Sequence, residues 1–161
     1  MTAVFLSLGS NIEREKHIRA AITALRHVLS DLELSSVYES EAVGFSGENF
    51  YNLIVRGEFS GDLATLARQL KELEDAHGRE RQGPRFSART LDIDIVLFGD
   101  RVGLHDGIQL PRAELYKNAF VLKPLAELAP DGVDPTSGKT FAQLWQELRI
   151  AQKLWIVPFI V

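Results

Sequence analysis

The sequence predicts an α+β fold, in which helices pack on a ferredoxin-like antiparallel sheet. Segments with the apolar pattern of strands and segments with that of helices follow one another in the order strand, helix, strand, strand, helix, strand. That order favours an antiparallel or mixed sheet with the helices on one face. The 161 residues are 45% hydrophobic, enough for one compact core. Since no repeat or linker divides the chain, we expect a single domain over residues 1–161.

The first predicted strand covers residues 3–8, AVFLSL, and the sequence GSNIE follows as a turn. Ser10 and Glu13 have the spacing of a capping box, which predicts that a helix begins there. Apolar residues then recur at spacings of three and four and form one buried stripe: Ile18, Ala21, Ile22, Leu25 and Leu29. Two strands are predicted next, over residues 32–40 and 49–59, with a loop of small residues between them.

A second helix is predicted over residues 62–78, and Gly78 stands where a left-handed C-cap is expected. Its buried positions again recur at helical spacing: Leu63, Leu66, Ala67, Leu70 and Leu73. A strand over residues 90–98, TLDIDIVLF, follows an arginine-rich loop. Helices over residues 119–128 and 140–149 complete the domain, and the apolar end at residues 154–161 is interpreted as core or subunit contact.

The composition excludes several classes of protein. A net charge of -4 and a pI near 5.6 argue against a general nucleic-acid binder, which needs a basic surface to neutralise phosphates. The absence of cysteine excludes disulfides and thiolate metal sites and suits a reducing cytoplasm. No apolar run approaches the roughly 20 residues that span a bilayer. We therefore expect a cytoplasmic protein whose partners are neither nucleic acid nor membrane.

Two aspartates interrupt the apolar strand at residues 90–98. In a strand, Asp92, Asp94 and Val96 share one face, while Leu91, Ile93, Ile95 and Leu97 share the other. The two aspartate Cα atoms lie roughly 6.6 Å apart, so their carboxylates repel each other unless a positive charge lies nearby. One interpretation is a structural ion pair with Arg89 or another nearby cation.

The other interpretation is a magnesium site, because Mg²⁺ prefers oxygen ligands and completes its shell with waters and phosphates. Four arginines precede the strand: Arg79, Arg81, Arg85 and Arg89. Guanidinium groups bind phosphate oxygens with two parallel hydrogen bonds. The combination predicts a polyphosphate clamp with metal on one side and arginine on the other.

Taken in order, these segments resemble the 6-hydroxymethyl-7,8-dihydropterin pyrophosphokinase family of folate biosynthesis. The resemblance rests on the segments SLGSNIEREKHIRAAITAL, SSVYESEAVGFSGENFYNLIV, LEDAHGRER, RFSARTLDIDIVLFGD and AFVLKPLAELAPD, which together cover nearly the whole chain. It implies a ferredoxin-like fold and a monomer or small oligomer. It also implies an enzyme that transfers pyrophosphate from MgATP to the pterin hydroxymethyl group and releases AMP.

The resemblance also implies roles for individual residues. Two Mg²⁺ ions are expected on Asp92 and Asp94, which with Arg79 and Arg89 form the expected catalytic group. The residues expected to bind nucleotide are Glu74, Arg79, Arg81, Arg89, Ile95 and Arg112. Those expected to bind pterin are Ser40, Val43, Phe50, Asn52 and Phe120, with Asn52 supplying hydrogen bonds, the two phenylalanines supplying rings, and Val43 contributing through its backbone.

The chain departs from the family pattern in the segment LPRAELYKNAF. Arg112 stands where many members have histidine, Asn118 where they have arginine, and Phe86 where a tryptophan is frequent. Arg112 is expected to supply the charge that Asn118 does not. Two alternatives stay open: a pterin- and nucleotide-binding paralogue with weak or no turnover, and a two-metal phosphohydrolase or nucleotidyltransferase using the same aspartates.

Overall fold

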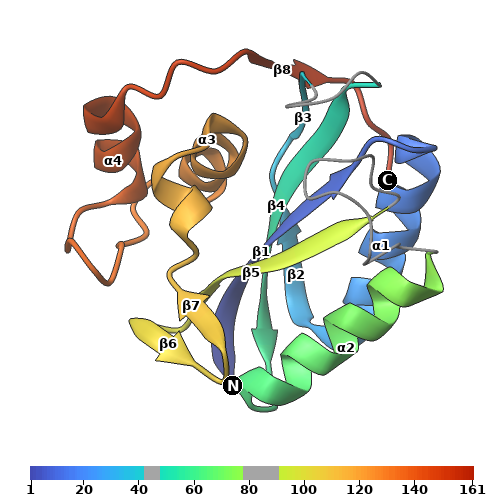
Figure 1. Cartoon of the computed structure of the whole chain (residues 1–161), viewed down its shortest axis with the longest axis horizontal. Helices are drawn as coiled ribbons and strands as arrows, with labels where there is room; N and C mark the ends of the chain where they lie inside the picture. The colour runs from blue at the N-terminus through green and yellow to red at the C-terminus, as the bar shows by residue number, and fades with distance from the viewer. Residues whose placement is uncertain (42–47, 78–90) are drawn as a thin grey trace.

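The computed structural model describes residues 1–41, 48–77 and 91–161. Its main sheet runs in the order β5-β1-β4-β3-β8, with β2 paired to β4 beside β3, and every pairing is antiparallel (Figure 1). These strands are β1 (Thr2–Ser10), β2 (Ser30–Leu34), β3 (Val37–Ser40), β4 (Phe50–Phe59), β5 (Asp92–Phe98) and β8 (Leu154–Val157). The predicted α+β class and antiparallel sheet are confirmed.

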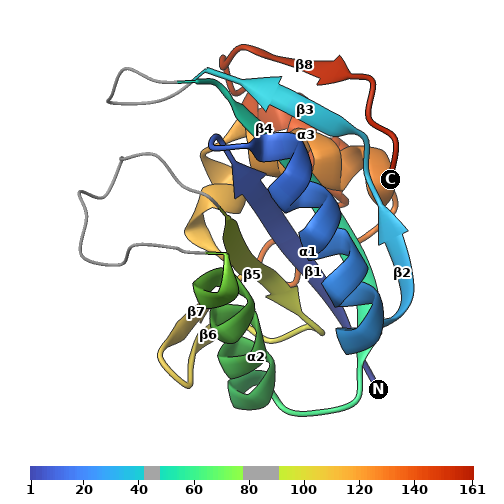
Figure 2. The same ribbon diagram turned by 90° about the vertical axis from the view of Figure 1, so that its right-hand side faces the viewer.

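The four α-helices in the described ranges cover both faces of this sheet, whereas the order of elements predicted helices on one face. Helices α1 (Arg14–Val28) and α2 (Leu63–Ala76) lie on one face, and α3 (Ala119–Leu128) and α4 (Phe141–Leu148) lie on the other (Figures 1 and 2). The strands have apolar residues on both faces, such as Leu53 toward α1 and Ile54 toward α3, so each face needs a cover.

Strand β5 contains an irregularity that alternation does not predict. Its register with β1 shifts between Phe5 and Leu6, which is a β-bulge. Ile93 and Ile95 pack in the core beneath α1 and α2, as expected, but Leu97 joins Val96 in the core beneath α3 and α4. The prediction that Leu97 shares the face of Ile95 is therefore wrong, because the bulge inserts an extra residue before it.

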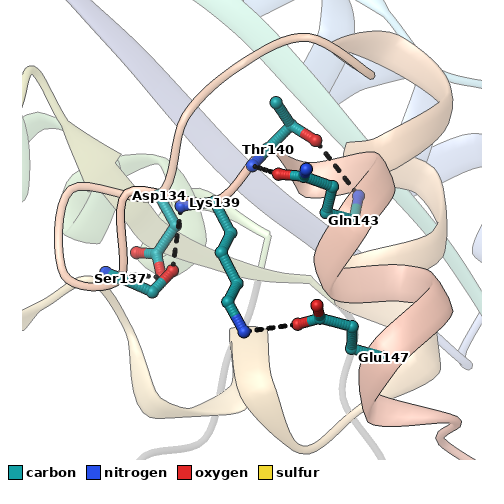
Figure 3. A network of polar contacts seen from close by, with 6 residues as sticks. All are labelled: Asp134, Ser137, Lys139, Thr140, Gln143 and Glu147. Atoms are coloured by element: carbon teal, nitrogen blue, oxygen red, sulfur yellow. Dashed lines mark hydrogen bonds and ion pairs between the residues drawn. The ribbon is translucent and has the colours of Figure 1, made fainter.

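The helix starts also differ from the predicted caps. Ser10 belongs to β1 and donates its hydroxyl to the Ile12 carbonyl, and the N-cap of α1 is Glu13 in a left-handed conformation without a side-chain cap. The capping box predicted from Ser10 is therefore wrong. A capping box does occur at α4, where Thr140 and Gln143 bond each other's backbone N–H groups (Figure 3). Gly78, the predicted C-cap, lies outside the described residues.

Three short elements were not predicted, namely β6 (Gly103–His105), β7 (Ile108–Leu110) and the 3₁₀ turn η1 (Ala113–Tyr116). The apolar C-terminal segment forms β8 and pairs with β3 at the sheet edge. Val157 packs against the core, but Trp155 and Ile156 are exposed, so the core interpretation is confirmed in part and the subunit contact stays a prediction. In the ranges described, none of the helices has the length and apolar character to cross a membrane.

Candidate active site

The strand register brings an amide and a carboxylate onto one row of the sheet. Gly9 in β1 pairs with Asn52 of β4 on one side and with Asp92 of β5 on the other. Directly paired residues of antiparallel strands point to the same face, and here it is the face covered by α3. The three residues therefore form a row, with the only side chains at its two ends.

Gly9 leaves space at the centre of this row. A Cβ atom placed there would lie 3.1 Å from Asn52 Oδ1 and 3.8 Å from Phe50 Cδ1. Any larger residue would displace the Asn52 amide. The sequence placed Gly9 at the start of the predicted turn GSNIE, whereas the structure places it in β1 between two other strands.

Ser40 and Phe50, two further residues expected to bind pterin, lie beside Asn52 at the end of this row. Asn52 Nδ2 donates a hydrogen bond of 2.7 Å to Ser40 Oγ, and both residues are buried. Phe50 pairs with Ser40 across β3 and β4 and is half-buried. Phe120 lies in the first turn of α3, on the helix that covers this face, and packs partly against its core. Val43 lies outside the described residues.

The carboxylate of Asp94 lies in an unusually negative environment. Burial and the neighbouring Asp92 carboxylate, with smaller contributions from Glu74 and Glu114, raise its pKa to about 7, although the Arg112 guanidinium opposes the rise. Arg112 Nη2 lies 3.5 Å from Asp94 Oδ1, and Arg112 Nε contacts Glu114 Oε2. Among the described residues, Arg112 supplies positive charge beside Asp94, and Arg89 lies outside them.

This donor set fits magnesium. Asp92 and Asp94 offer only oxygen, and within the described ranges no group of three His, Cys, Asp or Glu side chains forms a closed metal cage. Mg²⁺ is commonly bound by one or two carboxylates together with waters and substrate phosphates. Two neighbouring carboxylates with an excess of negative charge around them meet that requirement.

Glu74 holds the strand that carries both aspartates. Its side chain is only 6% exposed, and Oε2 accepts a 2.7 Å hydrogen bond from the N–H of Ile93, which lies between Asp92 and Asp94. Glu74 thereby fixes the backbone at the acidic pair, a role that the sequence did not indicate. Ile95 is buried in the core beneath α1 and α2. Contacts of Glu74 and Ile95 with nucleotide stay predictions.

The expected phosphate-binding arginines Arg79, Arg81 and Arg89, like Phe86, lie outside the described residues. Asn118, at the other departure from the family pattern, has a structural partner. Its Oδ1 accepts a hydrogen bond from Gln152 Nε2, and Gln152 Oε1 accepts one from the N–H of Ala119 at the start of α3. No sequence pattern links residues 33 positions apart, so only the fold reveals Gln152 as the cap of α3.

Comparison with known proteins finds one matching family. The family model described as 7,8-dihydro-6-hydroxymethylpterin-pyrophosphokinase (HPPK) matches residues 5–130. The 2-amino-4-hydroxy-6-hydroxymethyldihydropteridine pyrophosphokinase of Aquifex aeolicus is 33% identical over 149 residues, covering 91% of this chain and 92% of the relative. The protein of the same name from Synechocystis sp. is 38% identical over 150 residues, covering 89% and 74%.

A solved structure supports the fold alone. Wild-type HPPK-DHPS of Plasmodium falciparum matches with a TM-score of 0.69 at 13% identity, over 91% of this chain. This chain spans 44% of that longer protein. Because the family model covers most of the chain and the Aquifex relative matches along nearly its whole length, the chain belongs to the 7,8-dihydro-6-hydroxymethylpterin-pyrophosphokinase family.

Proposed function

We propose that the protein transfers pyrophosphate from MgATP to the hydroxymethyl group of 6-hydroxymethyl-7,8-dihydropterin and releases AMP, a step of folate biosynthesis. The observation that carries the proposal is the row Asn52, Gly9 and Asp92. Two strand spacings separate its ends by about 10 Å, which is the scale of a flat bicyclic heterocycle. A hydrogen-bonding amide therefore lies at one end of the row and a carboxylate at the other.

The buried amide is suited to recognising the heterocycle. Ser40 accepts one N–H of Asn52 and so fixes the amide plane, which leaves Oδ1 directed at the open position above Gly9. A fixed amide loses less conformational entropy on binding than a free one. Phe50 and Phe120 supply ring faces for stacking on the flat ligand. Val43, which follows β3 in the sequence, is proposed to contact the ligand through its backbone.

At the other end of the row, Asp92 and Asp94 would hold two Mg²⁺ ions. When bound, the ions would neutralise the triphosphate and lower the proton affinity of the substrate hydroxyl. The protein's part is to orient that hydroxyl in line with the β-phosphorus. The new bond joins the hydroxymethyl oxygen to the β-phosphorus, the bond to the α,β-bridging oxygen breaks, AMP leaves, and the hydroxyl proton passes to solvent.

Arginines would balance the charge of the phosphates. Arg79, Arg81 and Arg89 are proposed for this role from their positions in the family motifs. Arg112 is proposed as a further nucleotide contact, and its charge already lies beside Asp94. A well-placed donor to the developing charge contributes a few kcal/mol to the rate, about 3 kcal/mol for one oxyanion contact.

Identification of the nucleotide product tests this function. The protein is incubated with MgATP and the reduced hydroxymethylpterin, and the products are separated by ion-exchange chromatography. We expect AMP, formed only when the pterin is present, and none from the Asp92→Ala or Asp94→Ala variant. ADP would indicate an ordinary kinase, pterin-independent hydrolysis of ATP would indicate a phosphohydrolase, and no product would leave a binding protein.

A further inference from the structure

Arg112 is held beside the acidic pair by its own backbone. Its N–H donates a 2.9 Å hydrogen bond to the carbonyl of Val96 in β5, and its carbonyl accepts from the N–H of Leu115 in η1. Val96 follows Asp94 by two residues on the same face of the strand. The backbone of Arg112 is therefore held beside Val96, which is the next residue after Asp94 on that face of β5.

The guanidinium group bridges two carboxylates. Nη2 lies 3.5 Å from Asp94 Oδ1, while Nε of the same planar group contacts Glu114 Oε2. That Glu114 oxygen is buried, and in the described part of the chain no residue donates it a hydrogen bond with acceptable geometry. Arg112 is thus the charge that balances Glu114, and Glu114 in turn directs the guanidinium at Asp94.

This bridge places a cation beside a carboxylate that the proposed function assigns to a metal. A divalent ion that binds Asp94 must compete with Arg112 for the same oxygen. An ion that arrives alone gives Arg112 no new partner in exchange. An ion that arrives bound to a polyphosphate does give Arg112 a new partner, because guanidinium groups bind phosphate oxygens strongly.

Resting on the proposed function, in which Asp92 and Asp94 hold Mg²⁺, we propose that Arg112 is a tethered counter-ion that makes the site prefer MgATP to the free cation. In the metal-free protein it neutralises Asp94, with Glu114 as its tether. When metal and nucleotide bind together, the guanidinium leaves Asp94 for the phosphates. Glu114 is a positioning residue, since it acts through Arg112.

The test compares binding of Mn²⁺ alone with binding of MgATP. Free Mn²⁺ is measured by its electron paramagnetic resonance signal during titration of nucleotide-free protein, and MgATP binding is measured by calorimetry. The variants are Arg112→Ala and Arg112→Lys. Lysine keeps the charge but is a compact point charge on a flexible stem, without the planar forked geometry that aims the guanidinium at both carboxylates. Arg101→Ala is the matched control, because it removes the same charge just beyond the far end of β5.

We expect Arg112→Ala to bind Mn²⁺ about two- to fivefold more tightly than the parent, the range for loss of one partly exposed ion pair. The Mn²⁺ affinity of Arg112→Lys should lie between those of the parent and Arg112→Ala, and the Mn²⁺ affinity of Arg101→Ala should equal that of the parent. Binding of MgATP to Arg112→Ala should instead weaken by about tenfold or more, as expected for loss of a charge-assisted phosphate contact. Opposite changes for the two ligands are the signature of the counter-ion.

Three results would overturn the proposal. Unchanged Mn²⁺ affinity in Arg112→Ala would mean that Arg112 does not compete for Asp94. Parent-like Mn²⁺ affinity in Arg112→Lys would mean that charge alone matters and the bridge does not. Unchanged MgATP affinity would mean that Arg112 is not transferred to the nucleotide. These outcomes are separate from AMP formation by the parent protein, which tests the proposed function itself.

Discussion

Replacing Asp94 by asparagine should stabilise the metal-free protein at pH 8. Asparagine has nearly the same shape but carries no charge, so it removes the group that burial, Asp92, Glu74 and Glu114 disfavour in its ionised form. The rise of the Asp94 pKa from 3.8 to about 7 corresponds, at about 1.4 kcal/mol per pH unit, to an upper limit of about 4 kcal/mol. Because the amide must also be desolvated, we expect a gain of about 1–3 kcal/mol in the free energy of unfolding.

The sign of the pH dependence follows from the raised pKa. Between about pH 4 and pH 7 the folded state binds more protons at Asp94 than the unfolded state does. This contribution to stability is therefore complete below about pH 4 and is lost as pH rises through 7. The Asp94→Asn variant does not lose stability in this way as pH rises. Its free energy of unfolding should therefore exceed that of the parent only slightly at pH 4.5 and by the full amount at pH 8.

The assay is urea unfolding in EDTA at several pH values between 4.5 and 8, with and without added Mg²⁺. Groups other than Asp94 titrate in both proteins, so the difference between them reports mainly on this carboxylate. Asp100→Asn, which alters an exposed aspartate in the turn after β5, is the control and should change stability by less than about 0.5 kcal/mol. Added Mg²⁺ should stabilise the parent more than the variant.

The reasoning would be refuted if Asp94→Asn were less stable than the parent at pH 8 in EDTA. The ion pair with Arg112 would then outweigh the burial and repulsion at Asp94, and the acidic pair would be a structural feature. The interpretation of Asp92 and Asp94 as a metal site would lose its electrostatic basis.

Three further predictions concern other parts of the site and its supports. Gly9→Ala should weaken pterin binding without weakening MgATP binding in calorimetry, because its Cβ would lie 3.1 Å from Asn52 Oδ1; equal losses for both ligands would indicate general distortion. Gln152→Ala should lower the free energy of unfolding by about 1 kcal/mol through loss of the α3 cap, and an unchanged urea midpoint would show that solvent replaces it. Burial and the neighbouring His17 lower the pKa of His77, so the unfolded state takes up protons first and stability should fall as pH drops below about 6.5. His77→Gln should reduce this fall between pH 7.5 and 5.5 in urea unfolding, whereas an identical fall in both proteins would exclude His77 as its source.

Several features of this protein were determined by local sequence patterns alone. The sequence predicted a helix over residues 119–128, and α3 has those bounds. The alternation at residues 92–96 placed Asp92 and Asp94 on one face, opposite Ile93 and Ile95, as the two cores show. The motifs around RTLDIDI indicated the family that the comparisons confirm. These features can be read from the sequence because they depend on neighbouring residues and on the fixed periods of helix and strand.

The tertiary structure decided how these pieces combine. Asn52 and Asp92 are 40 positions apart, and only the register of β1 with both β4 and β5 places them at the ends of one row over Gly9. The bulge that turns Leu97 to the other face arises from pairing with β1 and leaves no signal in β5 itself. Roles for residues in 42–47 and 78–90 stay predictions, because these lie outside the described chain.

The contacts of Arg112 and Gln152 have the same origin. Arg112 reaches Asp94 because its backbone bonds to Val96, and Gln152 reaches α3 because the chain after α4 passes the start of that helix. Periodicity is set within a few residues by backbone geometry, so a sequence carries it directly. Register, ion pairing and capping between distant segments are set by which surfaces are buried together. They therefore exist only once the sheet and its two layers of helices have packed.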